Sequence, residues 1–155
     1  MIQRMKGECR MSKKTIEVKW PKLGISVEAE FLPYNRKFSE QFWKSLPFKT
    51  VQLHAMVTGE DMYSYCPVSP IEYMDLVEKR LPINEVPPGY ITWSGLGLLA
   101  MVYGPCTEPL RTQPIAKVPK RFHEDLKKAG RAAWESIFNT KEKLIVEFRK
   151  KGDPK

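Results

Sequence analysis

Strict alternation of apolar and polar residues marks the first two expected strands. The segment TIEVKW, residues 15–20, alternates with a period of two, and GISVEAEFL, residues 24–32, alternates again after Pro21 and Lys22. A period of two places successive side chains on opposite faces of a sheet. We therefore expect two antiparallel strands joined by a short turn.

Helical spacing replaces this alternation in residues 38–46. Four apolar positions define one helix face: Phe38, Phe42, Trp43 and Leu46. Ser39 stands between Phe38 and Trp43, which would form the hydrophobic staple around an N-cap. We expect a short helix that is capped by Ser39 and ends at Pro47.

The segment FKTVQLHAMVT, residues 48–58, is rich in β-formers and lacks breakers, so it predicts one long central strand that pairs with DMYSY after a turn at Gly59. Alternation divides it into two stripes. The apolar stripe, expected to face the core, is Val51, Leu53, Ala55 and Val57. The polar stripe, expected to face either solvent or a pocket, is Gln52, His54, Met56 and Thr58.

The sequence Ser69-Pro70-Ile71-Glu72 is a capping box with proline in the first helical turn. It predicts a helix to about Arg80, placed between strands as a plug or lid. Its expected buried face is Ile71, Met74, Val77 and Leu81.

The remaining pattern predicts a hairpin, a helix and a last strand. GYITW and GLLAMVYG, separated by residues 94–96, form a hairpin that is apolar on both faces. Amphipathic spacing predicts a helix over about 120–138, with Trp134 beside its apolar seam. The segment EKLIVEFR fits either a strand or a helix, and β-branched Ile145 and Val146 favour the strand.

Length and composition fit one domain. The 155 residues, 42% of them apolar, can bury one core of ordinary size. We expect residues 1–12 to be a disordered extension and residues 13–150 to form the domain. The expected fold is mainly β with helices, a small closed barrel of about eight strands with two or three covering helices.

The formal charge of +8 is unevenly distributed. Residues 1–22 carry seven Lys and Arg against two acids and residues 111–155 carry 13 against six, whereas residues 23–110 carry six against ten. A pocket in this acidic middle would repel phosphates, which argues against nucleic-acid binding.

The cysteine spacing, the breaker residues and the N-terminal sequence argue against several other classes of protein. Three cysteines, Cys9, Cys66 and Cys106, have no C-x-x-C spacing and accompany only two histidines, so neither a disulfide framework nor a metal site is expected. PPG and SGLG interrupt the uncharged run 86–107, which argues against a membrane span. The charged N-terminus has no apolar signal region, so we expect a cytoplasmic protein.

Three motifs carry a resemblance to a known family: Gly59-Glu60-Asp61-Met62-Tyr63, Tyr103-Gly104, and QPIAKV at residues 113–118. Together with the element order over residues 15–149, they resemble the small bacterial and archaeal cyclophilin-like proteins, and within them the relatives of cucumopine synthase. The resemblance implies a cyclophilin-like barrel and an enzyme that needs no cofactor. That enzyme would condense an amino acid or amine, such as histidine, with a 2-oxo acid in a Pictet–Spengler reaction. The F-H-R strand and Q-G-G-D turn of prolyl isomerases are absent, which argues against that activity.

Glu60 and Asp61 are the first catalytic candidates. Neighbouring side chains on a strand point to opposite faces, so at most one carboxylate faces the barrel mouth. The pair either fixes the hairpin or supplies one working carboxylate, for which we favour Glu60. His54 is the second acid–base candidate, because histidine exchanges protons near neutral pH.

The candidate binding residues come from three places. Tyr63, Trp93 and Tyr103 either pack in the core or form an aromatic wall for a flat ligand. Arg111, with Thr107, is the expected carboxylate clamp, although a surface arginine is the alternative. Gln52 and Gln113 complete the predicted substrate contacts. Cys106 is a possible nucleophile with no histidine near it in sequence.

The predicted function is therefore a condensing enzyme that acts on small molecules. The alternative is a non-catalytic module that binds a metabolite or peptide in the same pocket. The doubly apolar hairpin 90–103 also suggests a surface that a second copy covers in a homo-oligomer.

Overall fold

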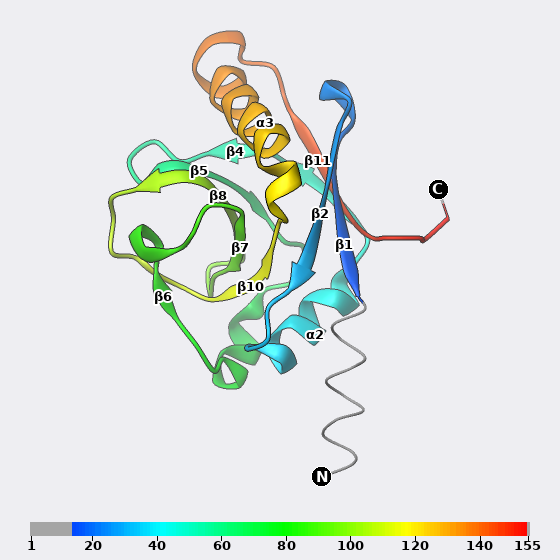
Figure 1. Cartoon of the computed structure of the whole chain (residues 1–155), viewed down its shortest axis with the longest axis vertical. Coiled ribbons are helices and arrows are strands. Elements are labelled where there is room, and N and C mark those ends of the chain that lie inside the picture. Colours follow the sequence, from blue (N-terminus) through cyan, green and yellow to red (C-terminus); the bar gives the residue numbers. More distant parts are fainter. Residues whose placement is uncertain (1–13, 155) are drawn as a thin grey trace.

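Nine strands of residues 14–154, the part of the chain that the computed structural model describes, form one strongly curved sheet (Figure 1). Its order is β3-β11-β1-β2-β10-β7-β8-β5-β4. The strands are β1 (Thr15–Trp20), β2 (Ile25–Phe31), β3 (Phe48–Val51), β4 (Leu53–His54), β5 (Gly59–Tyr65), β7 (Tyr90–Trp93), β8 (Leu98–Cys106), β10 (Pro114–Lys117) and β11 (Ile145–Lys150). The predicted N-terminal extension, residues 1–12, lies outside the described residues.

The sheet is a nearly closed barrel because its two edge strands are consecutive in the chain. β3 and β4 lie at opposite ends of the strand order, and only Gln52 separates them. The backbone N–H of Gln52 donates to the carbonyl of Leu144, 2.7 Å away. Its side chain accepts from Trp20 Nε1 at 3.0 Å and donates to the carbonyl of Tyr63 at 2.9 Å. One buried residue thus links β1, β5 and the segment before β11.

Smaller elements complete the chain. β6 (Leu81–Pro82) and β9 (Arg111–Thr112) form a separate two-stranded sheet. The helices are α2 (Arg36–Ser45), α3 (His123–Glu135), four 3₁₀ helices η1 (Pro21–Leu23), η2 (Pro70–Leu76), η3 (Ile83–Glu85) and η4 (Lys120–Phe122), and the π-helical turn η5 (Ser136–Thr140).

The main core fills the space between the sheet and the two α-helices, which lie at opposite ends of the view in Figure 1. β1 alternates as predicted, with Ile16, Val18 and Trp20 fully buried. Phe38 and Phe42 of α2 pack against Trp93 of β7, with ring centroids 4.7 and 5.6 Å apart. From α3, Leu126, Ala129 and Ala133 join the same core. Burial of these apolar surfaces is the main favourable term in folding.

The first two strands, the hairpin and the last strand are where the sequence predicts them. β1 pairs antiparallel with β2, β7 pairs antiparallel with β8, and residues 145–150 are a strand. This same chain packs against both faces of the hairpin, which explains its apolar character. The main core lies on one side, and a second apolar cluster that includes Ile83 and Val86 lies on the other. The apolar character of the hairpin is thus explained within one chain, and the homo-oligomer stays a prediction.

The structure of residues 48–58 differs from the single central strand that the sequence predicts. The segment divides into β3 and β4 at the edges of the sheet, and the two predicted stripes are not maintained, since each has buried and exposed members. Ala55 of the apolar stripe is buried and Met56 of the polar stripe is 73% exposed. Gln52 and His54 are buried, whereas Val57 of the apolar stripe is 72% exposed. The polar side chains can turn inward because each finds hydrogen-bond partners inside the protein, which removes the cost of burying them.

Two predicted helix details are also wrong. Asn35, not Ser39, is the N-cap of α2, and Ser39 is buried within the helix. The Ser69 cap does form, with Ile71 N–H donating to Ser69 Oγ, but the helix is a 3₁₀ helix that ends at Leu76. Its expected buried residue Ile71 is 67% exposed. Within residues 14–154, no helix has the length and apolar character that crossing a membrane requires.

Candidate functional site

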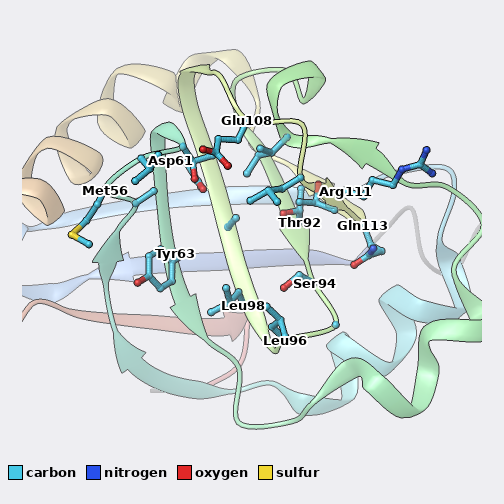
Figure 2. Close-up of a pocket in the computed structure, with 18 of the residues that line it drawn as sticks. Met56, Asp61, Tyr63, Thr92, Ser94, Leu96, Leu98, Glu108, Arg111 and Gln113 are labelled. Atoms are coloured by element: carbon cyan, nitrogen blue, oxygen red, sulfur yellow. The ribbon is translucent and has the colours of Figure 1, made fainter.

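A cavity of about 910 Å³ lies on the face of β5, β7 and β8 that is turned away from the main core (Figure 2). Strand alternation separates the two faces. Tyr63, Ala100 and Thr92 lie side by side across the three strands and line the cavity, whereas the next row, Met62, Met101 and Ile91, is buried in the core. The sheet thus provides a rigid floor for a binding site.

Loops form the walls and the mouth of this cavity. Residues 55–58 follow directly on β4, η2 contributes Ile71 and Met74, and the β7–β8 turn contributes Leu96. Met56, Ile71 and Leu96 are strongly exposed although they are large and apolar. An apolar rim around a concave site favours an organic ligand with an apolar surface.

Asp61 is the buried ionisable group of the cavity. Its side chain is 4% exposed, and Oδ1 has no hydrogen-bond partner. Removal from water disfavours the charged carboxylate, which raises the pKa of Asp61 to about 7. A carboxyl with this pKa can both accept and release a proton near neutral pH.

Three neutral residues of the cavity lining also have buried polar atoms without hydrogen-bond partners. They are Thr92 Oγ1, Ser94 Oγ and Gln113 Oε1. Thr92 is fully buried and Gln113 is 3% exposed, and Figure 2 shows both on the opposite side of the cavity from Asp61. Buried polar atoms without partners are rare in folded proteins, so these atoms indicate a place where a ligand supplies the missing hydrogen bonds.

Arg111 and Glu108 are the other charged side chains that line the cavity. Arg111 lies in β9 and is exposed. In Figure 2 its guanidinium points away from the centre, at the end opposite Asp61. The clamp residue predicted from sequence therefore lies at the mouth, where its long side chain can reach a ligand from outside.

Thr107 does not join Arg111 in the cavity lining. Its backbone N–H donates to the carbonyl of Thr58 at 2.8 Å, and its hydroxyl donates to the same carbonyl at 3.3 Å. Thr107 instead holds the segment 55–58 that forms one wall.

His54 and Tyr103 form a separate buried pair beneath α3. His54 Nδ1 lies 2.7 Å from the carbonyl of Ala55 and Nε2 lies 2.7 Å from the Tyr103 hydroxyl. Since a carbonyl can only accept, Nδ1 carries the proton and Nε2 accepts from Tyr103. Burial lowers the pKa of His54 and raises the pKa of Tyr103 to about 12, so both are neutral at pH 7. Neither lines the cavity.

Glu60 lies on this second face of β5. It is exposed, and its carboxylate packs over Gly104, where a Cβ atom would collide with it. The pairing of β5 with β8 shifts register between Gly59 and Asp61, which is a β-bulge. Opposite orientations for the two acids were expected from alternation, but the carboxylate that lines the cavity is Asp61 rather than Glu60.

The structure therefore brings together only part of the predicted site. The cavity lining includes Tyr63, Arg111 and Gln113 together with Asp61, the less favoured acid of the candidate pair, and Thr92 and Ser94 are members that the sequence did not single out. Gln52 closes the barrel, and Trp93 is fully buried in the core. Thr92 and Ser94 could have been found from their position flanking Trp93 in GYITWS, because alternation places them together on the face opposite that residue.

Cys106 lacks the features of a nucleophile. Burial raises the pKa of its thiol to about 11, with the nearby acids Asp61 and Glu60 adding to the effect. The thiol stays protonated at neutral pH, and the thiolate is the reactive form. Within residues 14–154, no cluster of three or more His, Cys, Asp or Glu side chains is placed to hold a metal ion.

Comparison with known proteins finds a similar solved structure. No protein-family model and no curated protein matches the chain. The solved structure of McbB in complex with tryptophan is similar, with a TM-score of 0.85 and 32% sequence identity. The match covers 90% of this chain and 46% of the McbB chain, so this chain spans about half the length of that neighbour. The similarity confirms the predicted mainly β barrel with helices.

Proposed function

We propose that this protein is a condensing enzyme that joins an aromatic amino acid or amine to a 2-oxo acid in a Pictet–Spengler-type reaction. The observation that carries the proposal is the buried, unpaired carboxyl of Asp61 at one end of a cavity that is otherwise mostly apolar. Two likenesses support it. McbB binds tryptophan, an aromatic amino acid, and the sequence motifs resemble the relatives of cucumopine synthase.

The chemistry needs one group that exchanges protons. The amine nitrogen attacks the oxo carbon, the oxygen leaves as water, and a carbon–nitrogen double bond forms. A ring carbon then bonds to the imine carbon, and the hydrogen on that ring carbon leaves as a proton. Asp61 has the burial and the pKa to take this proton and to assist the loss of water. The sum of the two reactants less one water gives the product, so no oxidant or reductant is required.

The cavity suggests where each reactant lies. Tyr63 offers an aromatic surface on the β5 part of the cavity floor, near Asp61, for a flat ring. Arg111 at the mouth can hold the carboxylate of the 2-oxo acid. Asp61 takes the acid–base role that the sequence favoured for Glu60 or His54, because neither of those side chains lines the cavity.

Mass spectrometry tests the proposal directly. Purified protein is incubated with tryptophan, histidine, tryptamine or histamine and a panel of 2-oxo acids. We expect a protein-dependent product at the summed mass less one water. A simple imine has the same mass but is reduced by borohydride, whereas the ring-closed product is not. Asp61→Asn should abolish the product, and Asp125→Asn on the exposed side of α3 should leave it unchanged. No product from any pair with folded protein would refute the proposal.

A non-catalytic binding module is the second candidate. The unpaired oxygens of Thr92, Ser94 and Gln113 favour it, since they can recognise a ligand without any chemistry. The two functions separate by experiment: ligands would stabilise the protein against heat under both, but only the enzyme would consume them.

A further inference from the structure

Exposed apolar side chains gather around the mouth of the cavity. Within residues 14–154, eight large apolar side chains are exposed to solvent, and five of them line the cavity. These five, the mouth residues, are Met56, Val57, Ile71, Leu96 and Leu110. Apolar side chains that stand singly on a surface need no explanation, but a group of them around a concave site indicates a place where an apolar group binds.

The mouth residues come from four segments that the fold brings together. Met56 and Val57 follow β4, Ile71 lies in η2, Leu96 lies in the turn between β7 and β8, and Leu110 directly precedes β9. Figure 2 shows Met56 and Leu96 at different sides of the cavity. No single amphipathic helix or strand therefore accounts for their exposure, which is a property of the assembled site.

The mouth offers one positive charge beside these apolar groups. Arg111 follows Leu110 in the chain and is the one cation among the residues that line the cavity. It can hold one carboxylate. A second carboxylate at the far end of the same ligand would lie among the mouth residues. Their side chains offer no hydrogen-bond donor, so the removal of that carboxylate from water would be disfavoured.

The cavity has room for such a ligand beside an aromatic amino acid. Its volume of about 910 Å³ is near the upper end of the range of roughly 300–1,000 Å³ that is usual for small-molecule sites. In the proposed function the ring of the amino acid lies on Tyr63, which leaves the mouth residues uncovered. The unpaired hydroxyls of Thr92 and Ser94 can donate to the carboxylate of the amino acid, so Arg111 stays available to the second substrate.

We propose that the second substrate is a 2-oxo acid with an apolar side chain, of the size of 2-oxohexanoate or 4-methyl-2-oxopentanoate, rather than a dicarboxylate such as 2-oxoglutarate. Its carboxylate binds Arg111 and its side chain packs against the mouth residues. This inference rests on the proposed function and names the substrate class that the same site takes as its second reactant. Burial of apolar surface on both the ligand and the protein is the driving force for the preference.

Calorimetric titration with 2-oxo acids alone measures this preference, since it requires no turnover. The ligands are 2-oxohexanoate, 2-oxoglutarate and pyruvate. The first two have chains of nearly equal length and differ mainly in the charge at the far end, whereas pyruvate lacks the chain. We expect 2-oxohexanoate to bind about tenfold or more tighter than either of the others. Binding of 2-oxoglutarate or pyruvate as tight as that of 2-oxohexanoate, or no measurable binding of 2-oxohexanoate, would overturn the inference.

Leu96→Lys and Ile71→Lys assign the preference to the mouth. Both side chains are strongly exposed, so the substitutions should leave the fold intact. Each adds a cation, which should strengthen the binding of 2-oxoglutarate and weaken that of 2-oxohexanoate until the two affinities differ by less than about threefold. Val68→Lys is the matched control, because Val68 is an exposed apolar residue that does not line the cavity, and it should keep the full preference. A preference that survives both Leu96→Lys and Ile71→Lys, or one that Val68→Lys abolishes equally, would also overturn the inference.

The outcomes also distinguish the inference from the proposed function. Tighter binding of 2-oxohexanoate without a condensation product from any amine would refute the enzyme and keep the site for an apolar acid. Condensation with 2-oxoglutarate that is at least as efficient, in kcat/KM, as condensation with 2-oxohexanoate would refute the apolar preference and keep the enzyme.

Discussion

The two faces of β5 carry neighbouring acids with opposite surroundings. Glu60 is exposed, beside the buried His54–Tyr103 pair, in which each polar atom has a partner. Asp61, the next residue, is buried in the cavity with an unpaired oxygen. The first face gains stability from satisfied hydrogen bonds. The second keeps an unsatisfied carboxyl at a cost in stability, which makes it available to a ligand.

Turnover is where the two acids should differ most. Asp61→Asn removes the proton-accepting group of the cavity, so the rate of product formation should fall by about 10²–10⁴-fold. Glu60→Gln should reduce it by less than about threefold, because Glu60 does not reach the cavity. Initial rates by quantitative mass spectrometry measure both. An equal loss in the two variants would contradict the assignment of the site to the Asp61 face.

Stability should depend on pH with opposite signs on the two faces. The folded state raises the pKa of Asp61 from 3.8 to about 7, so the folded protein binds the proton more tightly than the unfolded chain. The contribution of Asp61 to the free energy of unfolding is greatest below pH 4 and declines as pH rises through 7, by about 2–3 kcal/mol between pH 5 and pH 8. Urea unfolding across this range should show the decline in the unaltered protein but not in Asp61→Asn.

The contribution of His54 has the other sign. Its pKa is lowered from 6.5 in the folded state, so its contribution is present above pH 6.5 and is lost as pH falls through the lowered value. In the Asp61→Asn variant the opposing contribution of Asp61 is absent. The free energy of unfolding of this variant should therefore decrease as pH falls, because His54 becomes protonated. Adding His54→Gln to this variant should remove the decrease. If the decrease remains, the buried neutral histidine is not its cause.

The hydrogen bond beneath α3 should matter for stability and little for binding. Tyr103→Phe leaves His54 Nε2 buried without a donor, which should cost about 1–3 kcal/mol in the free energy of unfolding. Urea unfolding measures this loss, and calorimetry with tryptamine should show affinity within about twofold of the unaltered protein, since Tyr103 does not line the cavity. A large loss of affinity for tryptamine with unchanged stability would contradict this assignment, because it would place the ligand on the Tyr103 face.

Arg111→Ala should have the smallest effect of these substitutions. It should weaken binding of the 2-oxo acid and leave binding of the amine unchanged. Loss of the guanidinium should raise the KM for the 2-oxo acid by about tenfold or less, because the side chain is exposed. The affinity for tryptamine should not change. Arg121→Ala is the matched control, because Arg121 is exposed, pairs with Glu28 and does not line the cavity.

Local pattern was enough to predict much of the fold. TIEVKW, GISVEAEFL and the hairpin 90–103 form the expected strands because alternation and turn residues act between neighbours in sequence. The stripes of residues 48–58 could not be assigned in the same way. Gln52 and His54 face inward only because Trp20 and Tyr103, distant in sequence, provide partners for them.

The site was harder to predict for a related reason. Alternation shows that Glu60 and Asp61 diverge, but it cannot show which one enters a cavity. That choice depends on how β5 pairs with β8, including the register shift between Gly59 and Asp61. Alternation around Trp93 places Thr92 and Ser94 on one face, but it does not show that this face lines a cavity.

The peptide bonds on either side of Gln52 hold the two edges of the barrel together. Strands β3 and β4 hold opposite edges of the sheet, and residues 55–58, which follow them, form one wall of the cavity. A circular permutant opened at Leu96, on an exposed turn, would keep this link intact. A permutant opened at Gln52 would retain every strand pair yet release the two edges, so it should lose the cavity wall before it loses the sheet.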